Sequence, residues 1–360
     1  TSAEDFAQGQ WVEASGWPVQ SRFTIWLRSA TLRALAKNEI QSPPTASADY
    51  LTSTARVRAL KAQEARRALP VRVRGVVTMI HDEHGYFFLE QDGVGIFVDA
   101  SKQSLESLRL GDLLLVEGVT AAGGFASVIA HPNMRVIGHP GLPVPQPLEP
   151  EVALVGAQDS QWVELEGTAR KVGIENGELG FRVTSAVGSV QVIVVQDATP
   201  ESLAKFENAR VRLRGVLTTT FTESGHLTGL RMVVHSPDHV RILRPGPGDV
   251  FALPLRDIGE LLRFSADVRD STLVRVRGVV TLRQADHITI QDATGGTHVH
   301  GVIEDAEVGD LIEAVGYPRP TDSGPILTDA ITKRTGERGP AVPEQITVDD
   351  VLKGTSSNKL

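Results

Sequence analysis

The chain has 360 residues, of which 41% are hydrophobic and only 5% aromatic, and its formal net charge is −8. The acidic balance argues against a protein that binds duplex DNA through a basic surface, because such affinity comes mainly from lysine and arginine on phosphates. Cysteine is absent, which excludes a disulfide framework, a thiolate zinc site and a cysteine nucleophile. No stretch approaches the roughly 18 apolar residues of a membrane-spanning helix.

The chain opens in the middle of a unit that recurs further on. Gln8–Pro18 resembles Val308–Pro318, and both segments carry an apolar pair followed by Glu-Ala and then a glycine. We therefore assign residues 1–45 to a partial repeat and expect the chain, which begins at Thr1 and shows no signal peptide, to be a piece of a longer precursor.

A helical linker is expected next, over residues 46–68. Its helix should begin at Ser53 or Thr54, with the hydroxyl as N-cap, and run to about Ala68.

The first complete repeat contains an octapeptide that returns unchanged later in the chain. Val71–Thr78 is identical to Val274–Thr281, which is strong support for duplication. The match continues, since Phe88–Gly93 resembles Ile288–Ala293. A middle copy, beginning near Trp162, is more divergent.

Each repeat reads as a small β-barrel. Apolar and polar residues alternate in the octapeptide, which is typical of a strand with one buried face. Asp92-Gly93 is a tight-turn signal, and Ser101–Leu108 lies where an OB fold often has its helix. Final strands are expected near the following segments: Ser127–Ile137, His235–Leu243 and Leu327–Lys333.

Outward-facing charges on the first and fourth strands of each repeat have opposite signs, and the signs are exchanged in the middle copy. This exchange predicts that the two strands are neighbours, with each charge pair giving roughly 0.2–1 kcal/mol across the ladder. The residues concerned are Arg72, Arg74 and Glu117 in the first copy, Glu164, Glu166, Arg212 and Arg214 in the second, and Arg275, Arg277 and Glu313 in the third.

The predicted fold is therefore all-β, with tandem OB-like five-stranded barrels in three complete copies and one N-terminal partial copy, joined by short helices. The expected boundaries of the complete repeats and the tail are 69–150, 151–250, 251–345 and 346–360. The tail contains Ile346–Leu352, which resembles a segment that introduces a further unit.

The second and third strands of an OB fold usually carry the ligand site. In the first copy Tyr86, Phe88 and Phe97 could stack on a sugar, a base or a partner side chain if they are exposed, but packing against the next barrel is the commoner use of such apolar stripes.

In the third copy, His287, His298 and His300 occupy this region. They could offer imidazoles to a metal, but three such ligands without further context are a weak signal, so we predict no metal site and no cofactor. The sequence lacks the nucleophile-elbow, zinc-protease and phosphate-loop motifs, so we expect no catalytic residues and no enzyme.

The octapeptide, the aromatic strand, Gln91-Asp92 and Gly95–Val98 resemble the tandem OB-like segments in the extracytoplasmic regions of certain bacterial sensor histidine kinases. The resemblance covers nearly all of residues 8–353. It implies a cell-envelope location, periplasmic or extracellular, and an input or assembly role upstream of a kinase that this chain does not contain.

The predicted function is a non-catalytic binding, sensory or scaffold module. Its expected partner is a protein or a small polar ligand, with nucleic acid unlikely, and assembly through the N-terminal half-repeat is a further expectation. Two alternatives stay open: a binder of single-stranded nucleic acid or glycan, and an accessory domain of an enzyme.

Overall fold

The computed structural model describes residues 12–20, 25–34, 50–101, 103–153, 156–175, 178–185, 187–221, 227–261, 272–321 and 324–340. The chain divides into two compact units, Thr1–Tyr50 and Leu51–Leu360. The predicted tail at 346–360 lies outside the described residues.

The first unit contains an antiparallel hairpin of β1 (Val12–Gln20) and β2 (Ile25–Ala34). Its register copies that of the last two strands of the chain. Val12 pairs with Ala34 as Ile312 pairs with Arg334, and the ladder shifts after Ser15 as it does after Val315. The partial repeat therefore holds the fourth and fifth strands of a unit. Its side chains lie outside the described residues, and assembly through it stays a prediction.

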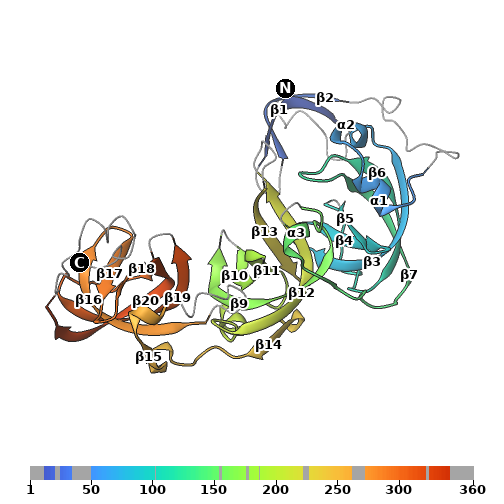
Figure 1. Ribbon diagram of the computed structural model, residues 1–360. Helices are drawn as coiled ribbons and strands as arrows, with labels where there is room; N and C mark the ends of the chain where they lie inside the picture. Colours follow the sequence, from blue (N-terminus) through green and yellow to red (C-terminus); the bar gives the residue numbers. More distant parts are fainter. Residues whose placement is uncertain are drawn as a thin grey trace. The chain divides into compact units, whose positions relative to one another are not determined.

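The second unit contains three five-stranded rings, each with its strands paired in the order 1-2-3-5-4 and closed by a pairing of strands 1 and 4 (Figure 1). Strand 3 pairs in parallel with strand 5 in every ring, and the other pairings are antiparallel, which is the topology of the OB fold. The predicted fold class is confirmed.

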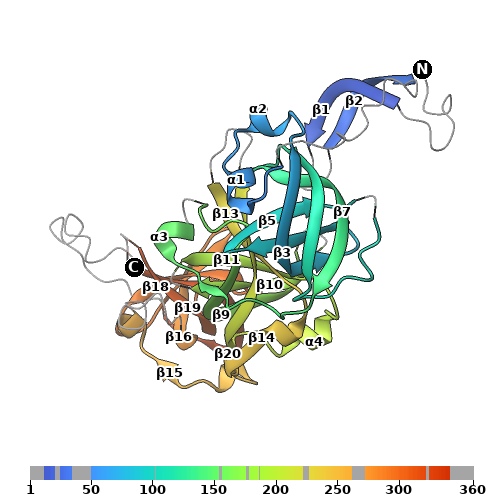
Figure 2. The same ribbon diagram turned by 90° about the vertical axis from the view of Figure 1, so that its right-hand side faces the viewer.

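The first barrel consists of β3 (Pro70–His81), β4 (Tyr86–Gln91), β5 (Val94–Asp99), β6 (Leu113–Ala121) and β7 (Val128–Gly138). Figure 2 shows β3, β5 and β7 of this barrel with α1 beside them. Asp92 and Gly93 form the tight turn between β4 and β5, and both have positive φ.

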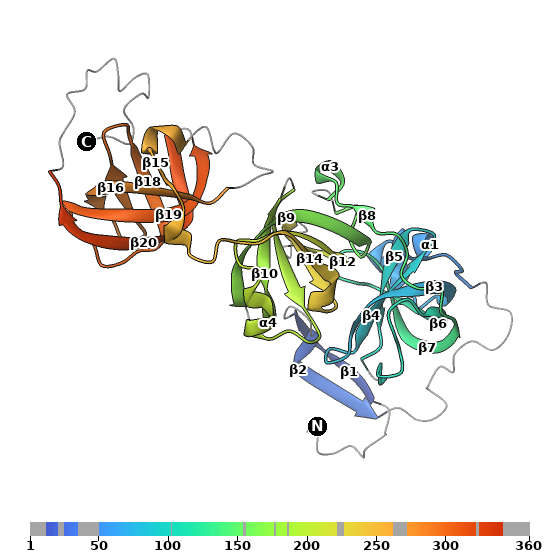
Figure 3. The same cartoon turned by 90° about the horizontal axis from the view of Figure 1, so that it is seen from below.

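The second barrel consists of β9 (Trp162–Glu175), β10 (Glu178–Ser185), β11 (Gly188–Val194), β12 (Arg210–Phe221) and β13 (Leu227–Val234). The third consists of β16 (Val274–Arg283), β17 (His287–Gln291), β18 (Gly296–Val302), β19 (Asp310–Thr321) and β20 (Gly324–Arg338), and Figure 3 shows β19 and β20 side by side.

A short lead segment precedes each barrel, runs parallel to strand 1 and is followed by one turn of helix. In the first barrel this segment is Leu51, which bridges to Val71 and precedes α1 (Thr54–Arg58) and α2 (Ala62–Ala65). In the second it is β8 (Gln146–Pro147), which precedes α3 (Pro150–Ala153). In the third it is β15 (Leu255–Arg256), which lies between η3 (Val250–Ala252) and η4 (Ile258–Glu260). β8, which precedes the expected boundary at residue 150, pairs with β9 of the second barrel.

Three local predictions were wrong. The helical linker at 46–68 contains two short helices, broken by the extended backbone of Lys61, and the Thr54 hydroxyl donates to Val94 O instead of capping a helix. The described residues of 101–108 form irregular loop and turns. Among the residues that the structure describes, α4 (Pro200–Ala204) of the second barrel is the one helix between strands 3 and 4. The third wrong prediction is the final strand of that barrel, expected near His235–Leu243. It is split into β13 and β14 (Val240–Arg244) by the η2 turn (Pro237–His239).

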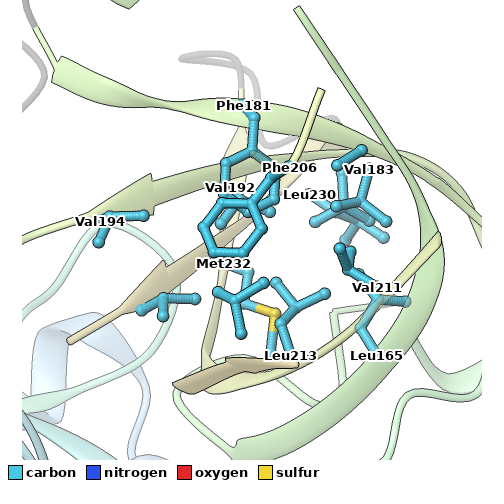
Figure 4. Packing of buried hydrophobic residues seen from close by; sticks show 14 of the residues in the cluster. Leu165, Phe181, Val183, Val192, Val194, Phe206, Val211, Leu213, Leu230 and Met232 are labelled. Carbon is cyan, nitrogen blue, oxygen red and sulfur yellow. The ribbon is translucent and has the colours of Figure 1, made fainter. Parts of the chain in front are cut away.

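Aliphatic side chains fill each ring. In the first barrel Val71, Val73, Leu114 and Val116 are at most 1% exposed, as the alternation of the octapeptide predicts. Figure 4 shows the core of the second barrel, where Phe181 and Phe206 lie over Met232 among the valines and leucines of the strands. With so few aromatics, shape-matched aliphatic packing carries most of the burial free energy.

The opposite charges on strands 1 and 4 face one another in all three barrels. Arg72 Nε donates to Glu117 Oε1 at 2.6 Å, and Arg214 Nε donates to Glu164 Oε2 at 2.8 Å. Arg212 Nε donates to Glu166 Oε1 at 2.6 Å. Arg74 lies opposite Leu115 in the register, so this member of the predicted set faces no carboxylate across the ladder.

The third barrel concentrates this interaction on one carboxylate. Glu313 accepts hydrogen bonds from both Arg275 and Arg277 at 2.6 Å, and its side chain is only 8% exposed. Burial opposes its ionisation, but the two arginines outweigh that cost, so the pKa of Glu313 lies below its usual value.

We predict that Glu313→Gln destabilises the third barrel by about 1–3 kcal/mol, because it leaves two arginines without their shared carboxylate. Glu117→Gln in the first barrel should cost about 1 kcal/mol or less, since that pair is largely exposed. Hydrogen exchange of β16 and β3 amides measures each effect locally. Equal losses of protection in the two barrels would contradict the prediction.

Candidate functional site

The outer face of strands 2 and 3 is the usual ligand surface of an OB fold. Backbone register identifies the equivalent positions in the three barrels. The cross-strand pairs at the centre of this face are Phe88 with Phe97, Arg182 with Gln191, and Thr289 with His298.

The first and third barrels have the same strand register at this face. The residue after the shared octapeptide pairs with the centre of strand 2 in both: Met79 with Phe88, and Leu282 with Thr289. The last residue of the octapeptide, Thr78 or Thr281, directs its hydroxyl to the carbonyl of the same strand-2 residue at 3.4 Å. The two faces therefore differ in side chains and in surroundings, but not in backbone geometry.

The aromatic face of the first barrel, formed by Tyr86, Phe88 and Phe97, is closed. Tyr86 is 9% and Phe88 2% exposed. Together with Met79 they pack against the following residues of the second barrel: Trp162, Val195, Val216 and Val233. The next barrel covers Tyr86 and Phe88, and Phe97 is partly buried against the same cluster, as the alternative interpretation of the stripe expects.

Backbone contacts fix this junction. Gly95 N donates to Gln161 Oε1 at 3.0 Å, and a Cβ on Gly95 would lie 1.8 Å from Ser160 O. Only glycine allows the β5 backbone to approach the second barrel so closely.

Gly95→Ala should therefore force the two barrels apart and destabilise the first by about 1–3 kcal/mol through overpacking. Limited proteolysis and hydrogen exchange of Trp162-containing peptides measure the opening. Gly124→Ala is the matched control, because a Cβ there meets nothing within 4 Å. The junction as described would be refuted if both variants retained wild-type protection.

His81 lies at the edge of the closed face, 6% exposed, with its ring 5.0 Å from Tyr86. Its Nδ1 is 3.2 Å from Nδ1 of His84. Burial, and secondarily the His84 charge, lowers the pKa of His81 to about 4. Burial also lowers the pKa of His235 and of His239, which are contributed by the second barrel.

The first barrel should lose stability in acid. Between about pH 6.5 and pH 4 the unfolded chain protonates His81 while the folded chain does not, so the free energy of unfolding falls as the pH drops, by about 2–3 kcal/mol from this group. Chemical denaturation from pH 7 to pH 4 measures it. The slope of the unfolding free energy against pH should flatten in His81→Gln. It should persist in His139→Gln, because the His139 side chain is 73% exposed. Identical slopes in the two variants would refute the assignment to His81.

The second barrel contacts the third through strand 1. The Arg170 guanidinium lies 3.2 Å from the centre of the Tyr317 ring and 3.3 Å from Asp329 Oδ2, and the Tyr317 hydroxyl donates to Asn208 Oδ1 at 2.7 Å. Burial raises the pKa of Tyr317 and lowers that of Arg170. Tyr317 follows the glycine of strand 4, as Val216 does in the second barrel, so both junctions use the same strand-4 position.

The equivalent face of the third barrel is open and carries histidines. His287, His298 and His300 are partly exposed, and Leu282, at the position of the buried Met79, is 45% exposed. We call this surface the histidine face, and it also includes Asp286 and Thr289. The structure brings all three predicted histidines together: the His287 ring stacks on His300, with centroids 4.7 Å apart, and lies 5.0 Å from that of His298.

Short polar contacts orient this cluster. His287 Nδ1 lies 2.9 Å from Asp286 Oδ1, and His298 Nδ1 lies 2.9 Å from Thr289 Oγ1. The hydrogen bond with His287 holds the pKa of Asp286 below its usual value, while burial and the neighbouring imidazoles lower that of His298. Asp286 was missed in the sequence because it lies in the turn before the strand, where only the hairpin geometry shows its direction.

The sequence alignment of this hairpin was shifted by one residue. The repeated Gln-Asp suggested that Phe88 matches Ile288, whereas the ladder matches it with Thr289. Gln91 and Asp292 are structurally equivalent, since each accepts a hydrogen bond from the first residue of the helix after the lead segment, from Thr54 N in α1 and Ile258 N in η4. A shift of one residue exchanges the two faces of a strand, so the letters alone could not assign the face.

A second surface feature is a cleft of about 600 Å³ between α1 and the lead segment of the second barrel. Its polar side chains already have structural partners. Gln146 Nε2 donates to Gly93 O, Gln158 Nε2 to Pro147 O and Gln161 Nε2 to Asp159 O. Within the described part of the chain, no helix is long and apolar enough to cross a membrane.

No known protein-family profile matches this chain, and no curated protein does. Solved structures with a similar local fold include the p204 HINb domain (16% identity, TM-score 0.22, 48% of this chain and 97% of that one) and the Ifi202 HINa domain in complex with 20-bp double-stranded DNA (15%, 0.20, 48% and 95%). A multidomain protein with nucleic acid binding domains from Streptococcus pneumoniae matches more of the chain (11%, 0.15, 79% and 78%). At these scores the likenesses do not bear on function.

Proposed function

We propose that the chain is a non-catalytic binding module of linked OB barrels, in which the histidine face of the third barrel is the recognition surface. The observation that carries this proposal is the contrast between two equivalent faces. Met79 is fully buried by the next barrel, whereas Leu282, at the same position, is 45% exposed. An open strand 2–3 face is the place where OB folds bind their ligands.

The partner we propose is a protein segment or a small polar ligand. The face offers three imidazoles and a carboxylate beside one exposed leucine, a mixture of polar groups with a small apolar area. The resemblance to the extracytoplasmic segments of sensor histidine kinases supports a periplasmic or extracellular location and an input role in signalling.

A site for single-stranded nucleic acid or glycan loses its best support. The stacking platform that such a site needs was expected at the aromatic face, which lies inside the first junction. The net charge of −8 also disfavours phosphate binding.

A photo-crosslinking residue at Val302 tests the recognition role. Val302 is 75% exposed and follows His298 and His300 on the outward parity of β18. In cells that express the chain in its native context, it should form a discrete adduct that is lost in the His298→Ala background. The same residue at Val144, 89% exposed in the connector, is the control and should give no such adduct.

Titration with single-stranded oligonucleotides and with glycans, at low and moderate salt, separates the alternatives. We expect no saturable binding of either. Salt-sensitive oligonucleotide binding, without an adduct at Val302, would replace this proposal with the nucleic-acid function.

A further inference from the structure

Although the sequence alone predicts no metal site, we propose that Asp286, His287 and His300 form a binding site for one divalent transition-metal ion, such as Zn²⁺, Ni²⁺ or Cu²⁺. This inference rests on the proposed function, because it names the ligand class of the same face. The donor atoms of the three side chains all lie within 4.8 Å of one another, and no other group of three such residues in the described segments comes as close.

The backbone holds two of the three donors in place. His287 and His300 are direct cross-strand partners on β17 and β18, so the antiparallel ladder sets the spacing between their Cα atoms. Their rings are nearly parallel, at 29°, with centroids 4.7 Å apart. Asp286 is the residue next to His287 and brings its carboxylate to the ring, with Oδ1 2.9 Å from Nδ1.

The donor set selects the class of ion. Imidazole nitrogens favour zinc, copper and nickel, whereas calcium and magnesium prefer sites made of oxygen. Two imidazoles and one carboxylate supply three ligands, so at least one coordination position stays available for water or for a donor from a partner. A metal held in this way would give the recognition face a strong, directional contact point.

His298 lies beside the site but outside the ligand set. It does not belong to the group whose donor atoms all lie within 4.8 Å of one another. Its Nδ1 lies 2.9 Å from the Thr289 hydroxyl, and its ring centroid is 5.0 Å from that of His287. Other close imidazole contacts lack the full set of donors. His139 approaches Asp112 at 2.7 Å without a second histidine. The pair of buried His81 and exposed His84 belongs to no group of three close donors among the described residues.

Isothermal titration of the tag-free chain with Zn²⁺, repeated with Co²⁺ and followed by visible absorption, tests the site. We expect one saturable ion per chain. Each of Asp286→Asn, His287→Ala and His300→Ala should weaken binding by about tenfold or more. His139→Ala is the matched control, because His139 also pairs with a carboxylate but has no second imidazole beside it. This variant should bind the metal as tightly as the wild-type chain does. Circular dichroism of each variant confirms that the barrel is folded.

Absence of saturable binding to the wild-type chain, or equal weakening by His139→Ala, would overturn the metal site. Binding that survives all three ligand substitutions would overturn it as well. The titration uses the metal alone, so its result does not depend on a partner. A chain that binds zinc but gives no adduct at Val302 would refute the recognition role and keep the metal site. A chain that forms the adduct but does not bind zinc would refute the metal site and keep the recognition role.

Discussion

The pairing of strand 1 with strand 4 is the constraint on which each barrel depends. It closes the ring, and its register puts the valines and leucines of both strands inside while arginine and glutamate meet outside. A shift of one residue would bury Arg72 or Arg275 and expose Val73 or Val276, so the misaligned ring is strongly disfavoured. The ion pairs add specificity to a register that apolar burial already favours, because most of them are exposed.

Successive barrels join in a repeated way once the rings are closed. The residue after the strand-4 glycine contacts the preceding barrel in both junctions, as Val216 in one and Tyr317 in the other. The chemistry differs: the first junction is an aromatic and aliphatic cluster, and the second is an arginine on a tyrosine ring with an aspartate beside it. Duplication thus preserved the geometry of the contact, while its side chains diverged.

Duplication also explains how one surface acquired two uses. The strand 2–3 face of the first barrel became an internal contact, and it carries Phe88 and Phe97. The same face of the third barrel carries the buried Thr289 and three partly exposed histidines, His287, His298 and His300. The usual ligand face of the fold is thus closed in one copy, and we place the recognition role in the other.

Much of this architecture could be predicted from sequence because the signals are local and repeated. The octapeptide Val71–Thr78 indicated the duplication, and its alternation indicated the buried face. The exchange of charge sign between Glu166 and Arg74 indicated which strands are neighbours. Burial of Tyr86, in contrast, depends on another barrel, and no periodicity in one strand encodes that contact.

The candidate site was predicted only in part, for a similar reason. Alternation placed His298 and His300 on one face and His287 was grouped with them, and the structure shows that His287 and His300 are direct cross-strand partners. Asp286 joins them because the hairpin turn brings its carboxylate to His287. The alignment of the repeated Gln-Asp differs by one residue from the strand register, and this offset concealed the equivalence of the two faces. Small indels in hairpins leave local propensity unchanged and yet decide which face a side chain occupies.

The central claim is that equivalent faces are closed in the first barrel and open in the third. The chain contains no cysteine, so single-cysteine variants report it directly. Met79→Cys and Leu282→Cys place a thiol at matching positions, and the labelling rate with a maleimide under native conditions measures its access. The account predicts rapid labelling at 282 and labelling at 79 that is slower by about a hundredfold or more, limited by opening of the junction. Comparable rates at the two positions would contradict it.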